Sequence, residues 1–327
     1  MTDSQPLSPE MEAIWKDELS PFLSERETRR KQAVKELVIG VGGGIAGGIV
    51  VLAVLLSLAM VPFAVFGLVA AIMAGSYFGG RKFMALRKEV KVGLLDRLAE
   101  ASSMRYSLKP PTPTRFNVFR EHGLIPSSNR EAFEDHFIGE RHGSVFELYE
   151  AELKQRRRSK NRTYYVTVFR GLMIRIEFPR TVEGVTVITR DKGIFNALEG
   201  WGRKTFGNKL EKVGLVDPKF EKIFEVYSSD QVMSRYLLTP TFMERLLALE
   251  IAVKGKKVRA AFDERQGGGE LLIAVETGNL FEPGSLFKPL DDEERVRNLL
   301  REIELVTGML DLMVRPPELG ENVLAGT

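Results

Sequence analysis

The stretch Leu37–Gly80, LVIGVGGGIAGGIVVLAVLLSLAMVPFAVFGLVAAIMAGSYFGG, contains no Asp, Glu, Lys, Arg or His. A long uncharged apolar run is typical of a membrane, where one spanning helix needs about 20 residues. A single straight helix over this run would be about 66 Å long, whereas the hydrocarbon core is about 30 Å thick. The sequence therefore predicts two spanning helices.

We place the two spans at 38–57 and 61–79, with a turn near 57–62. Pro62 lacks a backbone donor and disfavours helix at Val61, so the chain is expected to reverse there. The alternative is a buried helical hairpin in the core of a soluble protein. Such segments are shorter and more often have polar flanks, which favours the membrane.

Basic residues flank the run on both sides. Lys and Arg near span ends stay on the cytoplasmic side of a membrane, so both flanks, and both termini, are expected there. That arrangement agrees with an even number of spans. The basic residues are Arg29, Arg30, Lys31 and Lys35 before the run, and Arg81, Lys82, Arg87 and Lys88 after it.

The glycines within the run permit two interpretations. Gly42, Gly44 and Gly47 match the dinucleotide motif G-x-G-x-x-G, but the acidic residue required about 20 positions later is missing, since none occurs before Glu89. Spacings of four residues between small side chains instead favour close helix packing, against the other span or a second copy. The packing glycines are Gly40, Gly44, Gly47, Gly48, Gly75 and Gly79.

Composition limits the remaining choices. The chain has 327 residues, a net charge of +3 and no cysteine. The mild charge does not argue for nucleic acid. Without cysteine there is no disulfide framework or thiolate metal site, which suits a reducing cytoplasm.

We divide the chain into four segments. Residues 1–36 form an N-terminal cytoplasmic helical segment, and 37–80 the membrane hairpin. Residues 81–114 continue as a helix and end in the proline-rich connector Lys109–Thr114, which blocks helix. Residues 115–327 form a cytoplasmic α+β domain.

The pattern within 115–327 predicts antiparallel strands mixed with helices. Ser128 and Glu131 have capping-box spacing, which predicts a helix over Ser127–Ile138. Thr239-Pro240 is typical of a helix start, and the heptad-like apolar residues of Asp291–Val314 predict a C-terminal helix. Strands are expected at Val145–Leu153, Tyr164–Arg170, Leu172–Phe178, Val185–Thr189, Lys222–Tyr227, Lys257–Phe262 and Leu271–Val275.

Two motifs carry a family resemblance. One is Val168-Phe169-Arg170-Gly171-Leu172, preceded by Ile138-Gly139-Glu140. The other begins with FEKIFEVYSSDQ at 220–231 and continues through RYLLTP at 235–240 to Met243-Glu244-Arg245. Together they resemble the bacterial membrane-protein family known as domain of unknown function 3137 (DUF3137).

The resemblance implies a bacterial inner-membrane protein with a cytoplasmic domain. It implies no activity, no cofactor and no catalytic residue. The genetic setting of the family is similar to that of partners of LemA-type membrane proteins, which makes such a protein a candidate partner.

Three histidines lie close together in sequence. His122, His136 and His142 are near Asp135 and Glu140, and such side chains can bind a metal. Their spacing matches no ligand motif, so we expect solvated or hydrogen-bonded histidines and no metal.

Polar residues also gather at one strand-to-helix junction. Tyr227, Asp230 and Arg235 are the candidates there, and Asp230 could pair with Arg235 about one helical turn away. A structural ion pair plus a helix cap is the more ordinary explanation of this cluster. A surface cleft with binding or enzymatic activity is the alternative.

A basic run is the clearest expected surface feature. It joins two predicted strands and is therefore expected to be an exposed loop. It could be merely solvated, or it could be attracted to anionic lipid headgroups, at about 1 kcal/mol per basic residue. Nucleic acid is disfavoured because no aromatic residue interrupts the run. Its members are Lys154, Arg156, Arg157, Arg158, Lys160 and Arg162.

Two functional hypotheses follow. The first is an inner-membrane protein whose cytoplasmic domain is a binding or scaffolding module for membrane partners and anionic lipid, with a homo-oligomer as one option. The second is a membrane-anchored enzyme acting near Asp230. No nucleophile elbow, Walker loop or H-E-x-x-H motif supports the second.

Overall fold

The computed structural model describes residues 7–160, 162–178, 181–190, 210–215, 217–252, 257–265 and 268–314. It divides into two compact units. Unit 1 comprises Met1–Ala101 and Glu282–Arg301, and unit 2 comprises Ser102–Phe281 and Glu302–Thr327.

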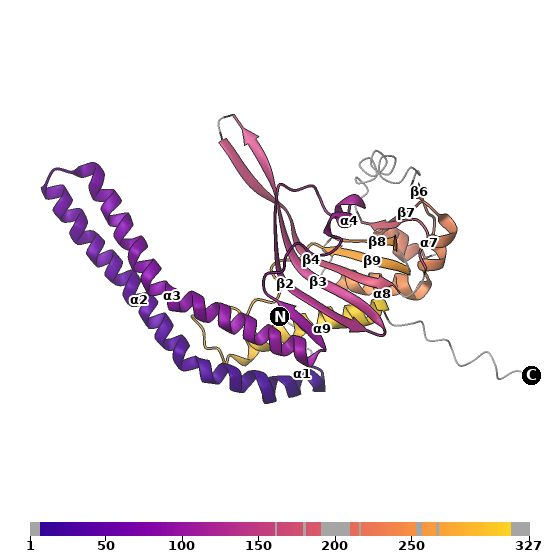
Figure 1. Ribbon diagram of the computed structural model, residues 1–327, viewed down its shortest axis with the longest axis horizontal. Coiled ribbons are helices and arrows are strands. Elements are labelled where there is room, and N and C mark those ends of the chain that lie inside the picture. Colours follow the sequence, from indigo (N-terminus) through magenta and orange to yellow (C-terminus); the bar gives the residue numbers. More distant parts are fainter. Residues whose placement is uncertain are drawn as a thin grey trace, which may run out of the picture. The chain divides into compact units, whose positions relative to one another are not determined.

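Unit 1 is built around two long helices (Figure 1). The short helix α1 (Pro9–Ile14) and the π-helical turn η1 (Trp15–Leu19) lead into α2 (Ser20–Ser57), and α3 (Val61–Ala101) follows. The predicted turn is confirmed: α2 ends at Ser57, Ala59 has φ of 56°, and α3 restarts with Pro62 in its first turn. Pro62 is tolerated there because the first helical turn lacks intrahelical donors anyway.

Both helices are long and apolar enough to cross a membrane. Only 6% of the most apolar window of each is buried. The core helix of a soluble protein would be mostly buried, so this exposure argues against a soluble helical hairpin. The large exposed side chains include Val50 and Val69.

Unit 2 contains one nine-stranded sheet, ordered β1-β2-β3-β4-β9-β8-β5-β7-β6, in which all neighbours are antiparallel. The predicted α+β class is thereby confirmed. The strands are β1 (Met104–Ser107), β2 (Arg130–Arg141), β3 (Ser144–Ser159), β4 (Arg162–Phe178), β5 (Thr186–Thr189), β6 (Glu211–Lys212), β7 (Glu225–Ser228), β8 (Val258–Arg265) and β9 (Gly268–Val275).

Among the described residues, five helices accompany the sheet in the sequence. Helix α9 is continuous, with its first part in unit 1 and the rest in unit 2. The helices are α4 (Phe116–Glu121), α6 (Pro218–Ile223), α7 (Gln231–Leu237), α8 (Pro240–Ala252) and α9 (Glu293–Val314).

Two local predictions are wrong. Residues 130–138 are not helical but belong to strand β2, which is paired with β1 and β3. The two capping-box residues do interact, since the Ser128 hydroxyl donates to the Glu131 carboxylate at 2.9 Å. This hydrogen bond lies beside a strand and caps no helix. Likewise Lys222 lies in helix α6, and β7 begins only at Glu225. Pairing within the sheet has overridden local propensity in β2, whereas Lys222 belongs to a helix that Asp217 caps and Pro218 begins.

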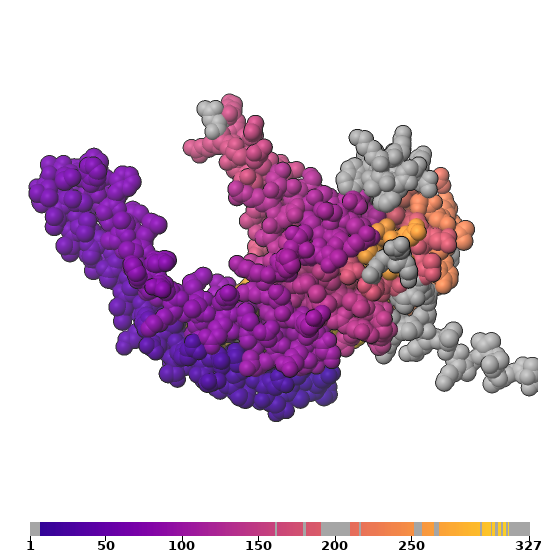
Figure 2. Space-filling model, viewed as in Figure 1, coloured from indigo at the N-terminus to yellow at the C-terminus, as the bar shows by residue number. Residues whose placement is uncertain are grey.

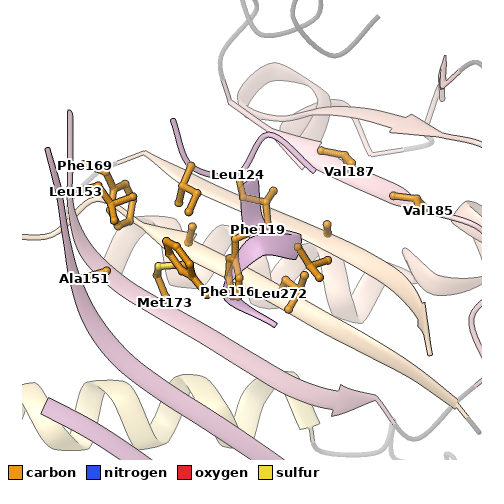
Figure 3. Close-up of a cluster of buried hydrophobic side chains, with 14 of the residues drawn as sticks. Phe116, Phe119, Leu124, Ala151, Leu153, Phe169, Met173, Val185, Val187 and Leu272 are labelled. Carbon is orange, nitrogen blue, oxygen red and sulfur yellow. The ribbon is translucent and has the colours of Figure 1, made fainter. Parts of the chain in front are cut away.

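The apolar core of unit 2 lies against one face of the sheet (Figure 3). Successive strand residues alternate between faces, so Tyr149, Met173 and Leu272 share this face with Phe116 and Phe119 of α4. The opposite face packs on α8, where the Phe242 and Phe262 rings are 5.1 Å apart.

A row of charged side chains crosses the same face as the α4 core. Glu147 of β3 pairs with Arg175 of β4 at 3.3 Å, and the fully buried Glu270 of β9 accepts from Arg115 at 2.8 Å. Arg115 also reaches Asp263 of β8 at 2.7 Å. Buried charges need such partners, so this row ties the start of α4 to the sheet.

Candidate functional site

Strands β3 and β4 extend well past the rest of the sheet (Figures 1 and 2). Strand β2 pairs with β3 only as far as Lys154, and β9 pairs with β4 only from Leu172 onward. Residues 155–159 of β3 and 162–166 of β4 therefore pair only with each other. We call this two-stranded segment, together with Lys160, the basic ribbon.

The charge of the basic ribbon is all of one sign. No Asp or Glu occurs between Lys154 and Arg170. Within the part of the chain that the structure describes, the ribbon's basic side chains make no ion pair with a carboxylate, and all are exposed. Only Lys154, at the root, has an acidic partner, Glu152 at 2.9 Å. The exposed members are Arg156, Arg157, Arg158, Lys160 and Arg162.

The expected loop is therefore a strand pair. Arg156, Arg157 and Arg158 are strand residues of β3, and Arg162 begins β4. The backbone amide of Arg156 donates to the Asn129 side chain at 2.8 Å, which fixes the root of the ribbon. Arginine has no strong strand preference of its own. Cross-strand pairing with the aromatic residues of β4 stabilises the strand conformation of the basic run.

The pairing register places two tyrosines directly opposite arginines. Arg156 faces Tyr165 and Arg157 faces Tyr164. The two rings are 37% and 47% exposed, respectively, which is high for aromatic side chains. The guanidinium carbon of Arg130, from β2, lies 3.7 Å from the centre of the Tyr165 ring. Each face of the ribbon thus combines guanidinium groups with a phenol ring.

This combination suits phosphate groups at an interface between water and an apolar phase. Guanidinium groups bind phosphate oxygens with paired hydrogen bonds. Tyrosine combines an apolar ring with a polar tip and is enriched where membranes meet water. The sequence missed Tyr164, Tyr165 and Arg130, although the unbroken β-rich stretch Thr163–Phe169 directly after the basic run could have indicated the strand pair.

The junction around Asp230 is occupied by helix-start contacts. The Asp230 carboxylate accepts from the amides of Val232 and Met233 at 2.8 and 2.9 Å and so caps α7. Arg235 donates to Gln231, one turn earlier in the helix, so the pairing of Asp230 with Arg235 that the sequence suggested is not formed. Cap bonds to the helix amides engage the aspartate more favourably than a single exposed ion pair.

Tyr227, three residues before Asp230, is buried. Its hydroxyl donates to the Glu225 carboxylate at 2.9 Å. Burial, helped by this bond and by the negative charge of Glu225, raises the pKa of Tyr227 to about 12. The phenol therefore stays neutral at physiological pH.

The three histidines do not converge. His122 lies 3.2 Å from Asp263, His136 lies 2.9 Å from Glu147, and His142 lies 3.6 Å from Asp311. Each imidazole thus faces a different carboxylate. Among the described residues no group of three or more potential ligands could hold a metal ion.

The glycines of the helical hairpin fall into two sets. A Cβ at Gly40, Gly44, Gly75 or Gly79 would lie within 3.0 Å of the facing helix, so these residues allow α2 and α3 to approach closely. Gly48 faces the Leu68 side chain at a similar distance. Gly47, by contrast, has nothing within 4 Å and lies on a different side of α2.

Comparison with known proteins gives a family match over part of the chain and no activity. Residues 167–314 match the model of a family described as a protein of unknown function, DUF3137, which confirms the resemblance over this segment. The match starts at Thr167, so the helical hairpin and the whole basic ribbon lie outside it. A comparison with curated proteins finds no match.

One solved structure is similar, the crystal structure of the mycobacterial trehalose monomycolate transport factor A, TtfA. The sequences are 10% identical, the TM-score is 0.32, and the match covers 68% of this chain and 96% of that one. A likeness this weak carries no argument about the present chain.

Proposed function

We propose that the chain is an inner-membrane protein with two spans, whose unit 2 is a binding module that contacts anionic lipid through its basic ribbon. The exposed, acid-free ribbon is the observation that carries this proposal. Each basic residue near an anionic surface contributes about 1 kcal/mol. The spans hold the module on the same chain as a membrane anchor, which keeps the local concentration of lipid high.

The experiment uses the absence of cysteine, which leaves no background for thiol labelling. A polarity-sensitive fluorophore is attached at Thr163→Cys in the ribbon, and the full chain is placed in nanodiscs of neutral or partly anionic lipid. We expect the label to enter a less polar environment as the anionic fraction rises. Added salt should reverse the change, because exposed charges are screened.

Two variants test whether the positive charge of the basic ribbon causes the response. Replacing Arg156, Arg157 and Arg158 together by Gln should remove about 3 kcal/mol, or roughly a hundredfold in apparent affinity. The matched control replaces the same three residues by Lys and should keep most of the response, since charge is what the surface reads. An unchanged response in the Gln variant, or tight binding of duplex DNA with no response to lipid, would overturn the lipid proposal.

The proposed topology places both termini in the cytoplasm and the turn at 58–60 on the opposite side. A membrane-impermeant thiol reagent applied to intact cells should label Met60→Cys and spare Glu25→Cys. Labelling of Glu25→Cys alone would reverse the orientation.

Candidate partners of the module are a LemA-type membrane protein, suggested by the family resemblance, and a second copy of this chain. Crosslinking of the intact protein in its native membrane, followed by mass spectrometry, distinguishes them. Self-links alone would favour a homo-oligomer.

A further inference from the structure

A loop in unit 1 follows strand β9 and runs along the two long helices. We call residues 282–290 the strap. Leu286 and Leu290 are buried, whereas Phe287 between them is 60% exposed. A single exposed apolar residue is ordinary, so its meaning depends on where along the helices it lies.

Contacts with α2 and α3 show how far each part of the strap lies from the uncharged run, measured along the helix axes. We call this distance the height. At 1.5 Å per residue, height follows from the number of residues beyond Leu37 on α2 or Gly80 on α3. The strap begins where the Glu282 carboxylate pairs with Lys91 at 2.8 Å. Lys91 is 11 residues beyond Gly80, or about 16 Å, and Arg87, which reaches the same carboxylate at 3.2 Å, is seven residues beyond it, or about 10 Å.

The middle of the strap lies much closer to the run. The Phe287 ring packs on Phe83, with ring centres 5.2 Å apart. Phe83 is three residues beyond Gly80, or about 4.5 Å along the axis. The preceding residue is held from α2, where the Arg30 guanidinium donates to the Leu286 carbonyl at 2.9 Å.

The end of the strap rises again. The Leu290 amide donates to the Glu27 carboxylate at 3.0 Å. Glu27 is ten residues before Leu37, or about 15 Å from the run. The strap is therefore a V whose tip, at Phe287 and Lys288, points toward the uncharged run.

We propose that the tip of the strap lies in the lipid headgroup layer and anchors unit 1 to the membrane surface. The inference rests on the proposed spanning role of the helical hairpin. The headgroup layer on each side is about 5–8 Å thick, so a height of about 4.5 Å lies within it. The tip offers an exposed aromatic ring followed by the exposed Lys288, the pair of side chains that such interfaces favour.

Neighbouring side chains extend the same belt around α3. Tyr77 and Phe78, just inside the end of the uncharged run, are 66% and 69% exposed, and Met84, one residue beyond Phe83, is 61% exposed. Aromatic belts of this kind mark the level at which a membrane meets water. Phe287 thus joins the belt from a segment about 200 residues later in the chain.

The test is a depth measurement on the full chain in lipid vesicles. A fluorophore is attached in turn to cysteines replacing Lys288, Met84, Glu25 and Val50, and nitroxides on lipid headgroups or deep in the acyl chains serve as quenchers. Glu25 is 12 residues before Leu37, or about 18 Å from the run, and reports water. Met84 reports the headgroup level, and Val50 reports the hydrocarbon core.

The label at Lys288 should be quenched by headgroup nitroxides as strongly as the label at Met84. Phe287→Ser should reduce that quenching toward the value at Glu25, and Phe287→Trp should preserve it. Quenching at Lys288 as weak as at Glu25, with deep quenching intact at Val50, would overturn the inference while leaving the spans in place. Loss of deep quenching at Val50 would overturn the spanning hairpin, and the inference with it.

Discussion

Two hairpins of this chain differ in almost every chemical respect. The helical hairpin of α2 and α3 has an uncharged stretch from Leu37 to Gly80, whereas the basic ribbon of β3 and β4 has five exposed basic residues and no acidic ones. The first satisfies its backbone hydrogen bonds within each helix, which hydrocarbon requires. The second satisfies them between two strands and leaves its outer edges to a polar surrounding.

Two layers of the same membrane can account for both hairpins. The hydrocarbon core excludes charge, and the headgroup layer attracts positive charge and aromatic rings. In our proposal the helical hairpin spans the core and the ribbon contacts the surface. A type of substitution that damages one hairpin should therefore be harmless when it is made in the other hairpin.

The largest effect is expected from charge in the helical hairpin. Val50→Lys together with Val69→Lys should cost about 3 kcal/mol for each lysine at the centre of a span. Less of the chain should then resist alkaline extraction from membranes. Val50→Leu with Val69→Leu is the control and should behave as the wild type. Full retention of the lysine variant in the membrane would break the comparison.

A smaller effect is expected from glycine replacements in α2. Gly44→Leu would put a Cβ 2.8 Å from the Ala71 carbonyl oxygen and should destabilise the helix pair by about 1–3 kcal/mol. Gly47→Leu has open space and should be nearly neutral. Unfolding by sodium dodecyl sulfate in mixed micelles measures both. A larger loss of stability from Gly47→Leu than from Gly44→Leu would indicate that the important contact lies on the other face of α2, toward a second copy of the chain.

A single charge in the ribbon should matter less. Arg157→Gln should weaken the response of the Thr163 label to anionic lipid by about 1 kcal/mol, or roughly fivefold, without changing thermal stability. Arg235→Gln, in α7 of the same unit, should leave the response unchanged. Equal losses in both variants would mean that total charge, and not the ribbon, governs binding.

The last prediction concerns the protonation of Glu27. Hydrogen bonds from Arg30, supported by the Leu290 amide, overcome the effect of burial and lower the pKa of Glu27 from 4.5 to about 2. The folded state thus favours the carboxylate, so its stabilisation is complete above about pH 4.5 and is lost as the pH falls toward 2. The stability difference between wild type and Glu27→Gln should shrink over that window in denaturant titrations.

A constant difference between wild type and Glu27→Gln down to pH 2 would show that the strap contact does not depend on the Glu27 carboxylate.

The sequence predicted the helical hairpin well because its information is local. Absence of charge, length and Pro62 are read directly from consecutive residues. Strand β4 was also recognised over most of its length, since β-branched and aromatic residues are frequent there. The C-terminal helix was expected from Asp291 and begins at Glu293.

The sequence predicted the ribbon poorly because its strand character depends on a partner. Arg156–Arg158 form a strand only against Tyr164 and Tyr165, and Ser127–Ile138 lost its helix to the sheet for a similar reason. The role of Asp230 was ambiguous because capping and ion pairing use the same spacing. The strap was not predicted, since residues about 200 positions apart meet there.

The depths of the two hairpins in one membrane can be measured together. Labels at Val50 and at Thr163 are compared in the same series of nanodiscs, as the anionic lipid fraction rises from zero. We predict that Val50 is quenched by deep nitroxides at every composition, while Thr163 approaches headgroup nitroxides only as anionic lipid increases. A Thr163 label that remains in water at every composition, or a Val50 label that is never quenched, would contradict the account.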